Sequence, residues 1–182
     1  MAPRMLILWT GPKHSGKTTA ALRLVAAARA QGWAVAGCLS PSLYENDRLL
    51  GFDIVNLGNA RRAPLARRRM VQGQEEGFQF LADGWALGAE ALDPAAVKNA
   101  DLIIVDEYGP LELAAQGWRA ATERLMTTTE AALLLVVREG LVEKVRRLYG
   151  GIVVHEMVAT EPGSIDKILA LLANPRRSPS YE

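Results

Sequence analysis

Short apolar runs alternate with amphipathic stretches along the chain. The run at residues 5–9 is followed at once by Thr10, Gly11 and Pro12, the pattern of a fully buried strand that ends in a turn. Over residues 17–31 small and apolar side chains recur at helical spacing, and Gly32 closes the segment. The N-terminal region therefore predicts a strand, a glycine loop and a helix.

The middle of the chain changes its pattern. Residues 33–40 predict a second buried strand, and residues 43–57 predict a hairpin with its turn at 45–48. Glycines, a proline and a burst of arginines follow, with one more short strand expected at 77–81. A helix is expected over residues 83–100, interrupted near Asp93 and Pro94.

Beyond residue 100 the alternation becomes regular. It predicts, in chain order, a strand at 102–106, a helix at 110–126, a strand at 131–137, a helix at 140–149, a strand at 151–155 and a helix at 162–172. Strands that alternate with helices favour an α/β fold with a parallel sheet covered on both faces. We expect one domain over residues 1–174, with the hairpin and an arginine-rich insertion at about 41–82, and a flexible tail at 175–182.

The composition and charge of the chain limit the classes of partner that we expect it to bind. In 182 residues, 21 Lys and Arg face 20 Asp and Glu, so no overall field attracts nucleic acid or an anionic membrane. The longest apolar run, at 131–137, is too short to span a bilayer, and no signal-peptide pattern precedes it. With one cysteine and two histidines, neither an intramolecular disulfide nor a structural zinc site is expected. We therefore expect a cytoplasmic protein with neither a nucleic-acid nor a membrane partner.

The sequence at residues 11–18 fits the phosphate-binding pattern G-x-x-x-x-G-K-[ST] at every fixed position. It follows a predicted strand and opens a predicted helix, a context that argues against a chance glycine turn. Lys17 is expected to reach the β- and γ-phosphates, and Thr18 to offer its hydroxyl to Mg²⁺. The residues expected to bind the nucleotide are Gly11, Pro12, Lys13, His14, Ser15, Gly16, Lys17, Thr18 and Thr19.

Two adjacent acids follow the predicted strand at 102–106. In phosphate-loop proteins an Asp at this place supports Mg²⁺, and a neighbouring Glu takes a proton from the attacking water. We expect Asp106 to serve the metal and Glu107 to act as the base. The alternatives are a strand-end turn for Asp106 and a helix cap or a solvated acid for Glu107.

Other polar residues have weaker signals. Arg138 is a candidate to sense the γ-phosphate, or else it begins a helix and pairs with Glu139; His155 is expected to be a partly buried strand-end residue. A group of arginines favours a solvated face, an acidic partner or closure over a nucleotide. These arginines are Arg61, Arg62, Arg67, Arg68 and Arg69.

Several segments together resemble one known family. The phosphate loop, the stretches at 37–45, 51–57 and 64–66, and the run Val-Asp-Glu-Tyr-Gly-Pro-Leu-Glu-Leu at 105–113 are similar to the cancer-related nucleoside-triphosphatases, over roughly residues 5–137. The resemblance implies a three-layer, parallel-sheet P-loop NTPase fold with the RecA-like strand order 5-1-4-3-2 and an inserted β-hairpin after the second strand. It also implies slow hydrolysis of ATP, GTP and other triphosphates, with Mg²⁺ held by Thr18 and Asp106, and it singles out Glu112.

The chain departs from the family in two places. Residues 155–161 lack the Asn-Arg-Asp that helps to hold the base, and residues 72–92 do not follow the family pattern. From the phosphate loop and the acidic pair we expect a Mg²⁺-dependent nucleoside-triphosphatase that produces diphosphate and phosphate. We expect it to tolerate different bases, because the loop binds phosphates and the base-holding triplet is missing. Two alternatives are a kinase that phosphorylates a small molecule, and a nucleotide-dependent binding module whose slow hydrolysis times its release from a protein partner.

Overall fold

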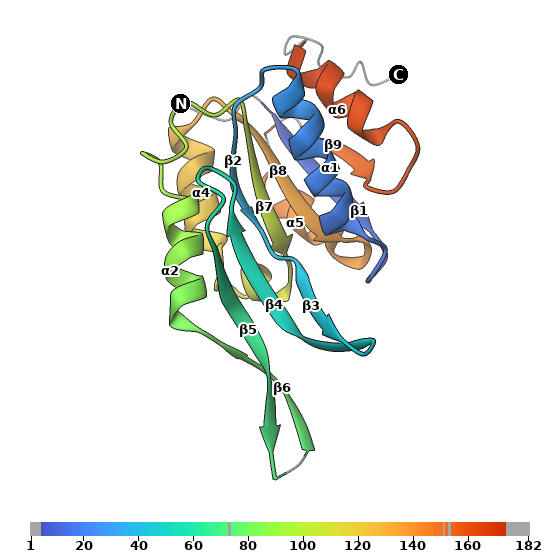
Figure 1. The fold of residues 1–182 in the computed structure, drawn as a ribbon. Coiled ribbons are helices and arrows are strands. Elements are labelled where there is room, and N and C mark those ends of the chain that lie inside the picture. Colours follow the sequence, from blue (N-terminus) through green and yellow to red (C-terminus); the bar gives the residue numbers. More distant parts are fainter. Residues whose placement is uncertain (1–4, 73, 151, 153, 174–182) are drawn as a thin grey trace.

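The computed structural model describes residues 5–72, 74–150, 152 and 154–173. Figure 1 shows one twisted sheet with helices on both faces and a narrow extension at one side. The tail expected at 175–182 lies outside the described residues. Among the described residues, no helix has the length and apolar character to cross a membrane.

The sheet contains strands of both directions. Its members are β1 (Leu6–Gly11), β2 (Val35–Leu39), β3 (Ser42–Glu45), β4 (Arg48–Asn56), β5 (Arg62–Val71), β6 (Gln74–Phe80), β7 (Leu102–Tyr108), β8 (Ala132–Arg138) and β9 (Val154–Val158). They lie in the order β6-β5-β4-β2-β7-β8-β1-β9, and β3 pairs with β4. The predicted parallel sheet is therefore one part of a mixed sheet, because the inserted strands join the same sheet in antiparallel pairing.

The parallel half of the sheet carries the N-terminal strand at its centre. β1 pairs in parallel with β8 and β9, and β7 pairs in parallel with β2 and β8. When only these five strands are numbered along the chain, their order reads 5-1-4-3-2. Every residue of β1 is buried, as is typical of a strand with both faces covered.

Helices cover the two faces of this half. They are α1 (Lys17–Ala30), α2 (Ala82–Ala91), α3 (Pro110–Leu113), α4 (Arg119–Thr128), α5 (Val142–Leu148) and α6 (Ser164–Ala173), with a 3₁₀ turn at Glu139–Leu141. Alternate residues of β1 serve opposite cores: Ile7 packs with residues of α1 and α6, whereas Leu8 packs with residues of α2, α4 and α5. The result is a three-layer arrangement (Figure 1).

The inserted segment is a β-structure throughout. β3 and β4 form the expected hairpin around Asn46 and Asp47, which both have positive φ angles, the conformation that suits a tight hairpin turn. The arginine-rich segment, expected to be loop-like, is the strand β5. Its buried residues, Leu65 and Ala66, are adjacent, and the arginines around them are exposed or partly exposed, so no alternation of apolar and polar residues marks the strand. Pro64 fits because the pairing of β4 with β5 shifts register beside it.

Three further elements differ from prediction. The helix expected at 110–126 is broken into α3 and α4, since Ala115 and Gly117 take positive φ angles of 59° and 57°. The helix expected at 83–100 ends at Ala91, before Asp93 and Pro94. The last strand, expected at 151–155, extends to Val158, and residues 151 and 153 lie outside the described residues.

Candidate active site

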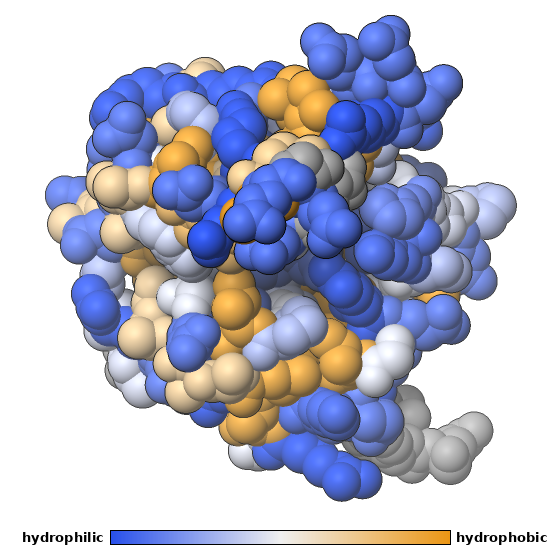
Figure 2. Space-filling model, turned by 90° about the horizontal axis from the view of Figure 1, so that it is seen from below, coloured by the Kyte–Doolittle hydropathy of each residue, from blue (hydrophilic) through white to orange (hydrophobic). Residues whose placement is uncertain are grey.

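Four parallel strands bring their carboxyl ends to one edge of the sheet. β1, β2, β7 and β8 run in the same direction, and the register of β1 on β8 places Gly11 beside Arg138. Ligands of open α/β sheets bind at this edge. Figure 2 looks onto it from below, where an apolar surface adjoins strongly polar side chains.

The phosphate loop joins β1 to α1 at this edge. His14 and Gly16 adopt left-handed φ angles of 60° and 86°, which curl the backbone immediately before the helix begins at Lys17. The free amides and the positive end of α1 therefore face the hollow of the loop. Within the described part of the chain, Ser15 Oγ is buried there without a hydrogen-bond partner, which suits a loop that receives an anion.

Lys17 folds back over the loop. Its side chain is buried, and its ammonium group donates hydrogen bonds to the carbonyl oxygens of Gly11 at 3.1 Å and Pro12 at 2.7 Å. Burial lowers the pKa of Lys17, although the carboxylates of Glu107 and Asp106 oppose this shift. The ammonium group therefore lies at the mouth of the loop, next to both acids.

Asp106 is held by three donors beneath the loop. Thr18 Oγ1 donates to Asp106 Oδ2 at 2.8 Å, the backbone N–H of Ser40 donates to the same oxygen at 3.1 Å, and the Ser40 hydroxyl donates to the Asp106 carbonyl oxygen. Burial raises the pKa of Asp106 to about 7, against the hydrogen bonds from Ser40 and Thr18.

The Thr18–Asp106 pair fits a magnesium ion. A hydroxyl and a carboxylate oxygen are donors of the kind that Mg²⁺ prefers, and a bound cation would favour the charged form of Asp106, against the burial that raises its pKa. The donor set thus agrees with the metal expected from the sequence.

Glu107 lies beside Asp106 at the end of β7, and the peptide bond between them is cis. Its Oε1 accepts a hydrogen bond from Arg138 Nε at 2.5 Å, and both side chains are partly exposed, at 34% and 40%. The ion pair of Arg138 is thus with Glu107, across two neighbouring strands, and not with the adjacent Glu139 that we considered.

Glu112, which the resemblance singled out, has a buried carboxylate that holds the chain between α3 and α4. It accepts hydrogen bonds from the backbone N–H groups of Gly109 at 2.8 Å and Trp118 at 3.0 Å. Burial raises its pKa. Glu112 is not among the residues that line the cavity at the phosphate loop, so its contacts are those of a structural residue.

Two cavities meet at the phosphate loop and share Ser15, Gly16 and Thr19. One, of about 580 Å³, lies over Lys17, Thr18, Asp106, Glu107 and Arg138. Its far wall consists of aromatic and aliphatic side chains of the inserted strands, together with Leu22 of α1. The other, of about 610 Å³, lies between the start of α1 and residues 159–166, which follow β9 and enter α6. The nine residues of the loop do not all contribute: Gly11 and Pro12 line neither cavity.

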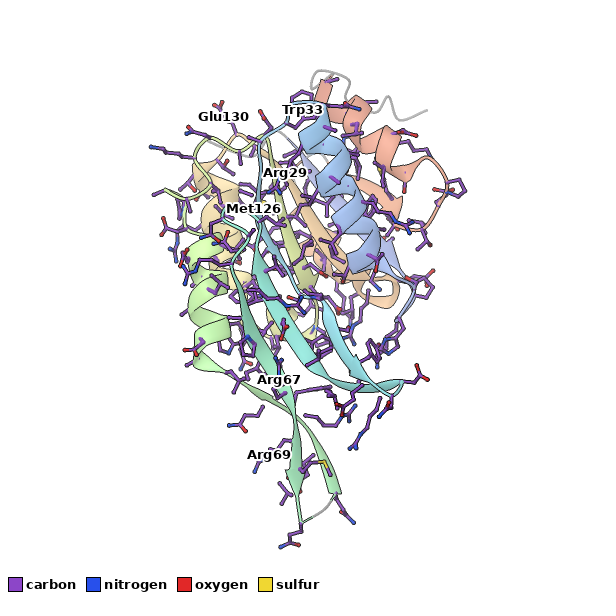
Figure 3. The ribbon with its side chains drawn as sticks, viewed as in Figure 1. Arg29, Trp33, Arg67, Arg69, Met126 and Glu130 are labelled. Carbon is purple, nitrogen blue, oxygen red and sulfur yellow. The ribbon has the colours of Figure 1, made fainter. Side chains whose placement is uncertain are left out.

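Three arginines of the inserted segment form ion pairs, two with a carboxylate of β4 and one with a carboxylate of α2. Asp53 Oδ2 lies 2.6 Å from Arg62 Nε, and Asp53 Oδ1 lies 2.5 Å from Arg67 Nη2. Arg61 Nη1 lies 2.8 Å from Glu90 Oε2. Figure 3 shows Arg67 and Arg69 along β5, with Arg69 nearer the tip of the extension. These contacts hold the insertion together and do not support closure over a nucleotide.

The structure also places two other candidate residues, Arg68 and His155. Arg68 stacks on Phe78 at 5.1 Å from the ring centroid and donates to the carbonyl oxygen of Leu49. His155 lies inside β9 beside Ile7, so it is not at a strand end, and burial lowers its pKa.

The sequence analysis missed three features of this site. Ser40 follows β2 at the same sheet edge as Asp106, so the rule on carboxyl ends of parallel strands was sufficient to find it. The Arg138–Glu107 pair depends on the adjacency of β7 and β8. The aromatic wall had no signal, because it comes from strands that fold back from the insertion.

Comparison with known proteins agrees with this geometry. The family model described as NTPase matches residues 6–163. A nucleoside-triphosphatase THEP1 from Methanopyrus kandleri is 32% identical over 130 residues, covering 71% of this chain and 72% of the relative. The THEP1 nucleoside-triphosphatase of Methanothermobacter thermautotrophicus is 30% identical over 142 residues, covering 75% and 79%.

Two solved structures share the fold. The solution structure of a human cancer-related nucleoside triphosphatase superposes with a TM-score of 0.67 at 22% identity, covering 97% of this chain and 100% of that one. The crystal structure of THEP1 from Aquifex aeolicus also gives 0.67, at 20% identity, covering 92% and 99%. The resemblance inferred from the sequence is confirmed: this chain belongs to the THEP1-type NTPase family and is a nucleoside-triphosphate hydrolase.

Proposed function

We propose that the chain hydrolyses ATP, GTP and other nucleoside triphosphates to diphosphate and phosphate, that it requires Mg²⁺, and that it tolerates different bases. The observation that best supports this proposal is the hydrogen bond of 2.8 Å from Thr18 Oγ1 to Asp106 Oδ2 below the phosphate loop, with Glu107 as the next residue. This arrangement combines an anion-binding loop, two oxygen donors for a divalent cation and an acid for water in one cavity.

Lys17 exchanges partners when triphosphate binds. In the free protein its ammonium group satisfies the carbonyl oxygens of Gly11 and Pro12, within the loop that receives the phosphates. Transfer of these hydrogen bonds to β- and γ-phosphate oxygens stabilises the charge that develops during cleavage. The amides of the loop and of the α1 N-terminus bind the remaining oxygens.

Thr18 and Asp106 hold the metal ion. When bound, Mg²⁺ supplies positive charge to the phosphate oxygens and orients them. Ser40 fixes the Asp106 carboxylate through its backbone N–H, so the carboxylate oxygen faces Thr18 before any ligand arrives.

Glu107 takes the proton of the attacking water. Its Oε1 is bound to Arg138, and Oε2 is the oxygen turned to water in this proposal. Arg138 positions the carboxylate and adds positive charge beside the γ-phosphate.

Base tolerance follows from the second cavity. We place the nucleoside between the start of α1 and residues 159–166, a segment that follows β9 and enters α6, and most side chains that line this cavity are small or polar. The Asn-Arg-Asp of the resembling family is missing here, so the phosphates supply most of the recognition.

Phosphate release from ATP, GTP, CTP and UTP, measured with Mg²⁺ and with EDTA, tests the proposal. We expect turnover of all four, loss of turnover in EDTA and one free phosphate per diphosphate without any added acceptor. Turnover of a single nucleotide, or full activity in EDTA, contradicts the proposal. A need for an added hydroxyl acceptor supports the kinase alternative instead.

A further inference from the structure

The wall of the 580 Å³ cavity that lies away from the phosphate loop takes no part in the proposed hydrolysis. It is built of Tyr44, Phe52, Phe78 and Phe80 with the aliphatic Leu22 and Leu49. Tyr44, Leu22 and Phe80 are 50%, 46% and 43% exposed, although large apolar side chains are usually buried. An attacking water needs no apolar surface, so these side chains suit an organic molecule.

Two of these rings pack on each other, and a third packs on Trp85. Phe52 and Phe78 lie with centroids 5.2 Å apart, and Arg68 covers Phe78 at 5.1 Å. Phe80 packs on Trp85 at 5.3 Å, which fixes its ring although it is partly exposed. In Figure 2 apolar side chains gather on this face next to polar ones. Preset rings of this kind favour stacking with a flat heteroaromatic molecule.

Positive charge lies in the same cavity. Lys13 and Arg138 line it, in addition to Lys17. Arg68 lines a smaller adjoining hollow that shares Lys13 with this cavity. Arg138 uses its Nε for Glu107, and its remaining guanidinium N–H groups are the donors that this inference assigns to a ligand. A molecule that stacks on the rings and carries an anionic group matches both halves of the cavity.

We propose that this cavity binds a second substrate, a flat heteroaromatic monophosphate, and that the γ-phosphoryl group is transferred to it. The ring stacks on Phe78 and Phe80, and the phosphate lies between Lys13 and Arg138. This inference rests on the proposed function, because it uses the same triphosphate site as the donor. Hydrolysis is then the reaction that occurs when the acceptor is absent.

The transfer balances without a base. An oxygen of the acceptor phosphate forms a bond to the γ-phosphorus, and the bond from that phosphorus to the β–γ bridging oxygen breaks. The electron pair of that bond leaves with the nucleoside diphosphate. A monophosphate is largely a dianion at neutral pH, so no proton has to leave the attacking oxygen. The products are two diphosphates.

Binding is tested on protein saturated with Mg²⁺ and a non-hydrolysable ATP analogue, so that the phosphate loop is already filled. The probe is adenosine 5′-monophosphate, titrated by calorimetry beside adenosine and ribose 5-phosphate, which carry only the ring or only the anion. We expect the monophosphate to bind about tenfold or more tightly than either part. Equal or absent binding of the monophosphate overturns the proposal.

Variants locate the site. We expect Phe78→Ala, and independently the more exposed Phe80→Ala, to weaken monophosphate binding by about 5- to 100-fold, the usual effect of removing a stacking ring. The matched control is Met70→Ala, because Met70 is 50% exposed on the same extension and does not line the cavity. Thermal unfolding identifies a variant that fails to fold. Unchanged affinity in two folded aromatic variants contradicts the proposal.

Transfer is read with γ-labelled GTP and unlabelled adenosine 5′-monophosphate. Label that appears in ADP supports the proposal, and label found only in inorganic phosphate contradicts it. Phosphate release without any acceptor is measured separately. A failure of that reaction sinks the proposed hydrolysis, whereas the binding titration reports on the acceptor site alone.

Discussion

The Lys17 side chain is hydrogen-bonded to the phosphate loop. Its ammonium group is held by the carbonyl oxygens of Gly11 and Pro12, and in the proposed mechanism it then turns to the phosphates. We predict that Lys17→Ala abolishes turnover and weakens triphosphate binding, because the lost charge acts in both the ground state and the transition state. Steady-state phosphate release and titration with an ATP analogue measure the two effects. Hydrolysis at the parental rate by the variant is the result that sinks this role.

Glu112 has structural contacts in spite of its place in a family motif. Its two carboxylate oxygens each accept a backbone N–H, from Gly109 and Trp118. In Glu112→Gln one oxygen becomes an amide N–H₂, which leaves one buried N–H without an acceptor. We predict a loss of about 1–3 kcal/mol in the free energy of unfolding and little change in turnover of the folded protein.

Urea unfolding and phosphate release at matched folded concentration separate these effects. The reverse result, normal stability with lost turnover, would move Glu112 into the active site.

At the scale of elements, the insertion is stabilised by one carboxylate. Burial alone would raise the pKa of Asp53, but hydrogen bonds and positive charge from Arg67 and Arg62 outweigh it and lower the pKa. A carboxyl group with a lowered pKa in the folded state adds stability that is complete above its unfolded-state pKa. This stability is lost as the pH falls through the folded-state pKa.

We therefore predict that Asp53→Asn destabilises the protein by about 1–2 kcal/mol at neutral pH. The lower part of this range is expected, because Arg62 is 53% exposed and solvent screens its charge. The difference from the parent should shrink below about pH 4, where the parental carboxyl group also becomes protonated. Urea titrations of both proteins between pH 3 and 7 provide the measurement. A difference that does not depend on pH would assign the effect to packing.

Some of the strands and helices could be predicted from the sequence, and others could not. The buried strands that meet at the site were readable because parallel strands covered on both faces have unbroken apolar runs, as at Leu102–Tyr108. The loop and the Asp106–Glu107 pair follow directly from a local motif. The strand β5 was missed, since its exposed or partly exposed positions from Arg67 to Arg69 carry charged side chains, which hide any apolar alternation. The break between α3 and α4 depends on Glu112 reaching Trp118, a contact that no periodicity reveals.

At the scale of the whole molecule, one sheet edge joins two unlike surfaces. The parallel half supplies the phosphate loop and both acids, and the antiparallel extension supplies the apolar wall of the same cavity. Pairwise contacts between such distant segments are not encoded in any local pattern, so the wall is a result of the structure alone. The polar second cavity lies on the other side of the loop.

This arrangement predicts weak discrimination between purine bases. A protein that reads a base edge through buried hydrogen bonds rejects the wrong base strongly, because the mismatch leaves polar groups unpaired. We expect the dissociation constants of non-hydrolysable ATP and GTP analogues to differ by less than about a thousandfold, or ~4 kcal/mol. A larger preference would mean that residues 159–166 have rebuilt a specific base site.

Glu107 tests the central claim most directly. Glu107→Gln keeps the size of the side chain and a hydrogen-bond acceptor for Arg138 but removes the basic carboxylate, while Thr18 and Asp106 still hold the metal ion. The measurement is single-turnover hydrolysis of ATP together with equilibrium titration of a non-hydrolysable analogue in Mg²⁺. We predict nearly unchanged binding and a fall of about 10²–10⁴ in turnover, the usual contribution of positioned proton transfer. Unchanged turnover with intact binding would contradict the account.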